Sequence, residues 1–118
     1  MNNHQEIDAF SLAAHIYLCG RLRDQPEKLE LLAACVSRWM EYEEVEGSRV
    51  YLREWKKAIE RGIDAVIDLC LEESDHGQAL RSCSPFGVLW TAKERWEFRA
   101  DWRRRRRAGE SLSSDESV

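Results

Sequence analysis

The chain has 118 residues, of which 43% are hydrophobic and 34% are charged, and its formal net charge is −4. This length fits one domain with a modest core and excludes the large two-layer interior of a typical metabolic enzyme, while the apolar content is too high for a disordered chain. The net charge is −6 over residues 1–92, +5 over residues 93–107 and −3 over residues 108–118. We therefore expect an acidic body, a basic helix end and a short acidic tail.

The N-terminal sequence MNNHQEIDAFSL lacks the basic region and the small-residue cleavage site of a secretory signal. No apolar run approaches the roughly 20 residues that span a bilayer. These features predict a cytoplasmic protein that does not enter the membrane. The four cysteines are widely spaced and form no CxxC pair, so we expect them to be reduced rather than paired in disulfides.

The first predicted helix covers residues 6–23 and is apolar nearly all round. One face carries Ile7, Phe10, Ala14, Tyr17 and Leu18, and the opposite side carries Leu12, Ile16 and Cys19. A helix with this pattern is either central in its own fold or covered by another subunit, and the sequence leaves both alternatives open.

Two further helices follow. Asp24 and Pro26 are typical of a helix start, and the apolar stripe after them predicts a helix to about Val45, before Gly47. The next helix begins after Ser48, and its apolar residues recur at helical spacing as far as Cys70. Gly62 lies inside this pattern and indicates close helix packing or a bend.

The segment of residues 74–84 contains three serines and, inside it, His76 followed by Gly77, and it is predicted to be a connecting loop. Ser84 and Pro85 favour the start of a last helix, which we expect to reach about Arg107, before Gly109. Four helices with short connections predict an all-α fold, a small bundle of about four helices, as a single domain over residues 1–109. Residues 110–118 are predicted to be a disordered acidic tail.

The sequence gives little support for catalysis or for a bound cofactor. Ser74, Asp75, His76 and Cys83 are close in sequence, but a nucleophile and its base must lie within hydrogen-bonding distance, which closeness in sequence does not supply. His76 lacks the paired spacing of a metal site, and the scattered glycines form no phosphate-binding loop. We expect a protein that is not an enzyme and holds no metal or cofactor, with an enzymatic role for the His76 segment as the weakest alternative.

Three of the five tryptophans, Trp90, Trp96 and Trp102, fall on the predicted last helix at intervals of six residues. At about 100° per residue these side chains are about 120° apart around the helix axis, so at least one should point away from the body. An exposed tryptophan beside arginines is typical of protein interfaces. The alternative, which the sequence leaves open, is that Trp55 and Trp90 fill the core and that the other tryptophans lie flat under arginine side chains.

The arginine run of residues 103–107 raises a second possibility, because basic residues among tryptophans can bind exposed bases. Positive residues are also favoured at a helix C-terminus by the helix dipole, and the body of the chain is acidic. A small nucleic-acid-binding regulator that uses this helix end is therefore the alternative function, and direct nucleic-acid binding is the less favoured one.

Three segments carry a resemblance to a known family: CVSRWMEYEEVEG, SRVYLREWKKAIERGIDAVIDLC and SPFGVLWTAKERWEFRADWRRRRR. In these segments, in length and in its acidic helical layout, the chain resembles the QslA type of quorum-sensing anti-activators over nearly its whole length. The resemblance implies a non-enzymatic, homodimeric helical inhibitor. It also implies a partner, the ligand-binding domain of the LuxR-type transcriptional activator LasR, whose dimerisation and hence DNA binding would be blocked.

The candidate interface residues come from the first and last predicted helices. An inhibitor that covers a partner's self-association surface needs an apolar patch with aromatic anchors and no catalytic residues. The candidates for the partner contact or the self-dimer are Phe10, Leu12, Ile16, Trp90, Trp96, Trp102 and Arg103. Their division between the two surfaces is left open.

Overall fold

The computed structural model describes residues 3–42 and 47–116, with side chains for residues 5–42 and 47–109. These ranges are helical and contain no strand, as predicted. Instead of four long helices they hold α1 (Asn3–Asp24), η1 (Pro26–Lys28), α2 (Leu29–Met40), α3 (Arg49–Arg61), α4 (Ile63–Cys70), α5 (Asp75–Ser82), η3 (Pro85–Leu89) and α6 (Ala92–Glu116). The predicted end of the second helix at Val45 lies outside the described residues.

The helix predicted to follow Ser48 is broken at Gly62. This glycine has a φ of +116°, a backbone conformation that side chains with a Cβ rarely adopt, so α3 ends there and α4 starts in a new direction. The N–H of Gly62 still donates to the carbonyls of Ala58 and Ile59 at the end of α3. Of the two readings of Gly62, the bend is confirmed, and it lets α4 pack against α3.

The loop predicted over residues 74–84 is wrong, because most of it forms α5. The Ser74 hydroxyl accepts a hydrogen bond from the N–H of Gly77 at 3.0 Å and caps the helix. Gly77 is buried where an added Cβ would lie 1.8 Å from the Glu72 carbonyl oxygen. The serine and glycine that suggested a loop are therefore an N-cap and a close-packing site.

The core is built around Trp55 of α3, which is fully buried. Its indole N–H donates to the Leu80 carbonyl of α5 at 3.0 Å, and its ring lies 5.8 Å from the ring of Phe86 in η3. Leu18 and Leu22 of α1 join the same core. Buried side chains from α2 and α4 complete it, namely Leu32, Val36, Val66, Ile67 and Cys70.

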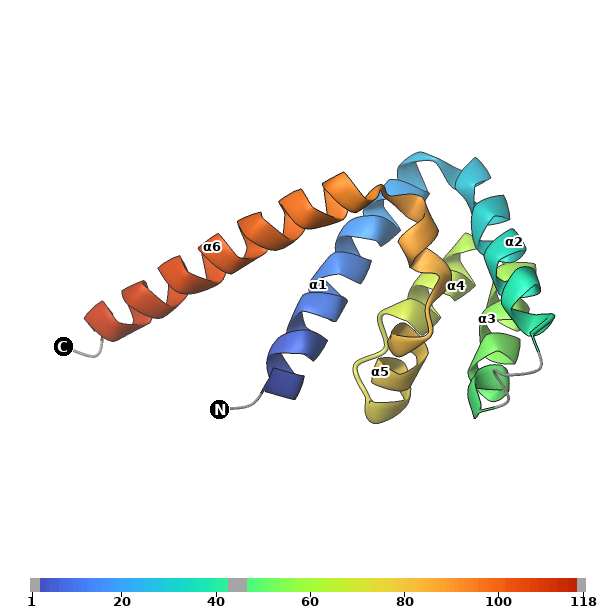
Figure 1. Cartoon of the computed structure of the whole chain (residues 1–118), viewed down its shortest axis with the longest axis horizontal. Helices are drawn as coiled ribbons and strands as arrows, with labels where there is room; N and C mark the ends of the chain where they lie inside the picture. The colour runs from blue at the N-terminus through green and yellow to red at the C-terminus, as the bar shows by residue number, and fades with distance from the viewer. Residues whose placement is uncertain (1–2, 43–46, 117–118) are drawn as a thin grey trace.

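Helix α1 is central in the chain's own fold, which confirms one of the two alternatives for it. Figure 1 shows it between α6 on one side and the group of α2 to α5 on the other. One side of α1 buries Leu18, Cys19 and Leu22 in the core, and a second side places Phe10 against α6. A third side leaves Ile16 54% exposed, so α1 also retains an uncovered apolar side chain.

Helix α6 starts later and continues further than predicted. Ser84 and Pro85 begin η3, whereas α6 begins after Thr91. The Thr91 hydroxyl accepts from the Glu94 N–H at 3.0 Å, and the Glu94 carboxylate accepts from the Thr91 N–H at 2.9 Å, a capping box. The helix passes Gly109 and reaches Glu116, where the sequence predicted an unstructured tail. Residues 117–118 lie outside the described residues.

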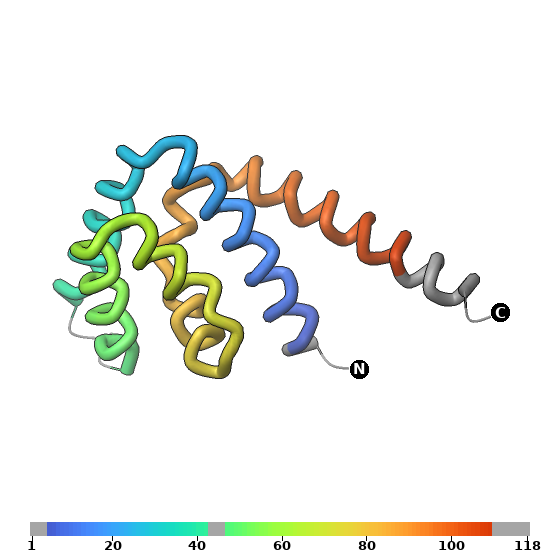
Figure 2. Tube along the Cα trace, turned by 180° about the vertical axis from the view of Figure 1, so that it is seen from behind, coloured from blue at the N-terminus to red at the C-terminus, as the bar shows by residue number. Residues whose placement is uncertain are grey.

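The backbone trace in Figure 2 follows α6 away from the group of α2 to α5. The helix packs against α1. The molecule measures 54 × 30 × 25 Å along its principal axes. Much of the α6 surface between Ala92 and Gly109 is consequently exposed. Within the described residues, no helix is both long enough and apolar enough to cross a membrane.

Candidate functional site

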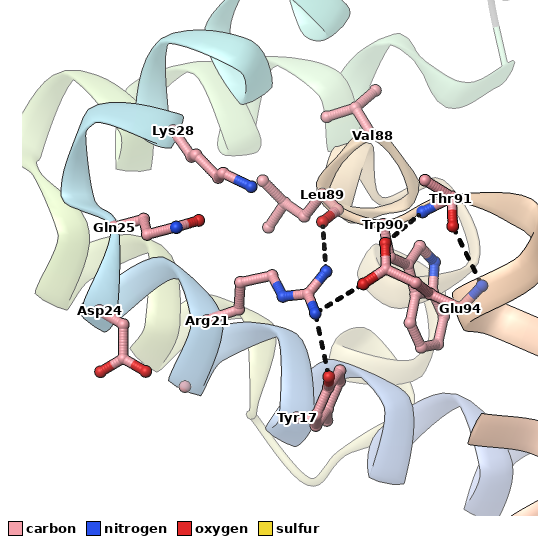
Figure 3. Close-up of a pocket in the computed structure, with 11 residues that line it drawn as sticks. Tyr17, Arg21, Asp24, Gln25, Lys28, Val88, Leu89, Trp90, Thr91 and Glu94 are labelled. Carbon is pink, nitrogen blue, oxygen red and sulfur yellow. Dashed lines mark hydrogen bonds and ion pairs between the residues drawn. The ribbon is translucent and has the colours of Figure 1, made fainter. Parts of the chain in front are cut away.

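Arg21 of α1 fixes the start of α6 (Figure 3). Its guanidinium donates to the Leu89 carbonyl at 3.1 Å and to the Tyr17 hydroxyl at 3.1 Å, and it forms an ion pair with Glu94 at 2.7 Å. Arg21 and the Thr91 N–H together lower the pKa of Glu94 to about 2. The carboxylate that caps α6 therefore also ties it to α1.

The hollow around Arg21 is lined mainly by polar side chains, with Asp24, Gln25 and Lys28 at its edge (Figure 3). The hydrogen bonds of Arg21 and Glu94 are made to each other and to neighbouring groups of the chain. This hollow acts as a structural junction that sets the direction of α6.

Beyond the junction, aromatic side chains join α1 and α6. The Phe98 ring of α6 lies 5.9 Å from Phe10, 5.1 Å from Tyr17 and 5.5 Å from Trp90. Trp102 meets Phe10 edge-on at 5.3 Å. Separations of this size are typical of favourable aromatic pairs. Three of the predicted interface residues, Phe10, Trp90 and Trp102, thus make aromatic contacts within the chain, and Phe10 is only 9% exposed.

The tryptophan prediction is confirmed in one respect and wrong in another. Trp90 precedes α6, so only Trp96 and Trp102 lie on that helix. Trp102 is half-buried, with the Arg106 guanidinium 5.0 Å above its ring, as the cation–π alternative describes. Trp96 is 70% exposed and points away from the body. The outward-pointing arrangement therefore describes Trp96, and the arrangement under an arginine side chain describes Trp102.

The remaining predicted residues lie on different sides of the molecule. Leu12 is half-buried, and Ile16 is exposed on α1. Arg103 is exposed on α6 and forms no ion pair with the described residues. The structure does not bring Ile16 and Trp96 into one patch with Phe10, because Phe10 lies beneath α6.

The arginine run is partly neutralised inside the chain. Arg104 and Arg105 both pair with Asp101, the latter at 2.8 Å, and Arg106 pairs with Glu6 at 3.0 Å. These pairs are largely exposed to solvent, and each contributes little to stability. The Glu6 pair nevertheless links the α1 N-terminal turns to α6.

His15 has partners that the sequence did not predict. Its Nδ1 donates to the Ser11 carbonyl at 2.6 Å, so its Nε2 accepts from the Ser84 hydroxyl at 2.9 Å. Burial lowers the pKa of His15, which favours the neutral ring. The Ser84 oxygen also accepts from the Phe86 N–H and caps η3. A pairing across 69 residues leaves no local sequence signal.

The serine, histidine and cysteine cluster predicted around residue 76 does not converge on one point. His76 Nε2 lies 2.9 Å from the Glu54 carboxylate, which raises the pKa of His76. The Cys83 thiol donates to the Ala79 carbonyl at 3.4 Å, and the Ser74 hydroxyl caps α5. Each group thus has a separate structural contact.

The described residues contain no group of three or more His, Cys, Asp or Glu side chains placed to hold a metal ion. The signals that sequence reasoning missed were the capping box from Thr91 to Glu94, which the spacing could have revealed, and Arg21, which no motif marks. Comparison of the chain with known protein families, with characterised proteins and with solved structures found no match.

Proposed function

We propose that this chain is a non-enzymatic, cytoplasmic anti-activator that binds the ligand-binding domain of a LuxR-type quorum-sensing activator, LasR, and blocks its dimerisation and DNA binding. The partner's identity comes from the resemblance to the QslA type of anti-activators. The observation that carries a protein-binding function is Trp96, 70% exposed on a helix that the rest of the chain holds in a fixed direction.

An exposed tryptophan on a well-supported helix is a good interface anchor. Tryptophan supplies a large rigid surface at a small cost in conformational entropy and is enriched among residues that dominate binding energy. The Arg21 junction and the Phe98 contacts order α6 before the partner arrives, so less entropy is lost on binding. The inhibitor needs no chemistry, because binding the activator monomer draws it away from the dimer.

A second apolar surface, on α1, is suited to self-association. Ala9, Leu12, Ala13 and Ile16 share one side of this helix, and none is charged. Ile16 is exposed and the other three are half-buried, and small residues such as the alanines allow another helix to approach closely. We assign this α1 side to the homodimer and the Trp96 side of α6 to the activator.

The experiment uses the purified full chain and the purified ligand-binding domain of LasR. Trp96→Ala should weaken their binding by at least about 2 kcal/mol, or about thirtyfold, as expected for a central anchor. Tyr42→Ala is the matched control, because Tyr42 is also an exposed aromatic residue, at 54%, but follows α2. Absence of binding by the wild-type chain, with both proteins folded, would contradict the proposed function.

Nucleic-acid binding is the second candidate, and one observation favours it. Lys93, Arg103 and Arg107 are exposed and, at about 3.6 residues per turn, lie on the same side of α6 as Trp96. Phosphate contacts of this kind give binding that weakens steeply with salt. If single-stranded DNA or RNA does not bind at low salt, this candidate is removed, and the acidic body makes the protein partner the favoured one.

A further inference from the structure

A groove of about 370 Å³ lies between α1, η3 and α6, and Trp96 is not among the residues that line it. Its apolar lining comes from Ile7, Phe10, Leu18, Phe86 and Trp90. This volume falls at the small end of the range of roughly 300–1,000 Å³ for small-molecule sites. A partner helix, about 10 Å across with its side chains, would need a longer and wider surface.

The edge of the groove is cationic. Arg95 and Arg99 of α6 extend over the Phe10 ring, with their guanidinium carbons 5.9 and 5.1 Å from its centre. Neither forms an ion pair with the described residues. Arg81 also lines the groove and hydrogen-bonds to the carbonyls of Cys70 and Glu72.

No carboxylate is among the described residues that line the groove. This absence is unusual for a chain with a net charge of −4, in which acidic residues outnumber basic ones. Three guanidinium groups beside an apolar surface create a positive potential that an anion can neutralise. The arginines are pre-placed for such an anion, because their guanidinium groups already lie over the Phe10 ring at the groove.

The polar groups in the groove other than the arginines already have partners. His15 donates to the Ser11 carbonyl and accepts from Ser84, and the Ser84 oxygen accepts from the Phe86 N–H. A ligand group placed here gains little from new hydrogen bonds and is best apolar. The groove therefore offers an apolar interior with positive charge at one edge.

We propose that this groove binds a medium-chain fatty carboxylate. The alkyl chain lies along the exposed Ile7 and the half-buried Trp90, and the carboxylate meets the guanidinium groups of Arg95 and Arg99, which suit planar anions. This site is separate from the Trp96 surface, so it does not depend on the proposed anti-activator function.

Calorimetric titration of the full chain with octanoate tests the proposal directly. Octanoate should bind at one site per chain, and 1-octanol, which has the same alkyl chain without the charge, should bind at least about tenfold more weakly because it loses a charge-assisted hydrogen bond. Hexanoate should bind more weakly by about fourfold for each methylene removed. Equal affinity for octanoate and octanol, or no octanoate binding, would overturn the proposal.

A matched pair of variants locates the site. Arg95→Ala/Arg99→Ala removes two charges at the groove and should weaken octanoate binding by at least about tenfold. Arg103→Ala/Arg107→Ala removes two charges from the same helix outside the groove and should change it by less than about twofold. Circular dichroism checks that both variants stay folded, and equal losses in the two would show non-specific attraction rather than a groove site.

Discussion

Replacing Phe98 with alanine should release α6 from α1 without unfolding the rest of the chain. The Phe98 ring contacts Phe10, Tyr17 and Trp90, all within 6 Å between ring centres, at 5.9, 5.1 and 5.5 Å. It is the only α6 residue of the described chain whose ring meets three others in this layer. Phe98→Ala leaves Arg21 and Glu94 in place, so it tests the aromatic contact separately from the ion pair.

The expected loss follows from these contacts. Aromatic pairs contribute about 0.5–1.5 kcal/mol each beyond the area they bury, and a fully buried Phe→Ala change costs about 3–5 kcal/mol. Phe98 is half-buried, so we expect a loss of about 2–3 kcal/mol in the free energy that holds α6 down. This corresponds to local opening of α6 that is at least about thirtyfold more frequent.

Hydrogen exchange followed by mass spectrometry measures this opening segment by segment. Amides of α6 in Phe98→Ala should exchange at least about thirtyfold faster, while those of α3 around the buried Trp55 should keep their rates. Trp96→Ala is the control on the same helix, and because its ring is exposed it should not speed exchange. Equal exchange in the two variants would refute the role of the aromatic layer in holding α6.

Three further predictions follow from single contacts. Gly77→Ala should lower the free energy of unfolding by at least about 3 kcal/mol, because the new Cβ would lie 1.8 Å from the Glu72 carbonyl oxygen. Gly20→Ala in α1 meets open space and should raise this free energy by up to about 1 kcal/mol, and urea titrations measure both changes. The pKa of Glu94 is lowered from 4.5 to about 2, so its stabilising contribution is complete above about pH 4.5 and is lost as the pH falls towards 2; Glu94→Gln should remove this part of the pH dependence of the urea midpoint. If α1 forms the homodimer, Ile16→Glu should halve the molar mass measured by light scattering. Leu31→Glu, at a similarly exposed position on α2, should leave the molar mass unchanged. A monomeric wild-type chain would contradict the dimer.

The all-helical class could be predicted because apolar residues recur at helical spacing through most of the chain. The helix boundaries could not, because the same residue types serve different purposes. Ser74 and Gly77 indicate a turn when read alone, yet in the structure they cap α5 and allow it to pack against Glu72. The helical spacing of apolar residues continues across Gly62, so the sequence did not reveal that its positive φ ends α3 and separates it from α4.

The candidate site was predicted in part for a similar reason. Helical spacing identified an outward tryptophan on the last helix, and Trp96 is one. The same spacing counted Trp90 as helical, because the capping box from Thr91 to Glu94 was not recognised. The link between His15 and Ser84 and the junction of Arg21 with Leu89 join distant parts of the chain, which no local pattern predicts.

The position of α6 also couples its two surfaces. Trp96 and the pair of Arg95 and Arg99 belong to one helix, and Trp96 is exposed while the two arginines line the groove. Their affinities would be thermodynamically linked if a carboxylate bound at the arginines and a protein bound at Trp96 favoured different positions of α6. Such a linkage is reciprocal: a carboxylate that changes the affinity for a protein bound at Trp96 by some factor has its own affinity changed by the same factor.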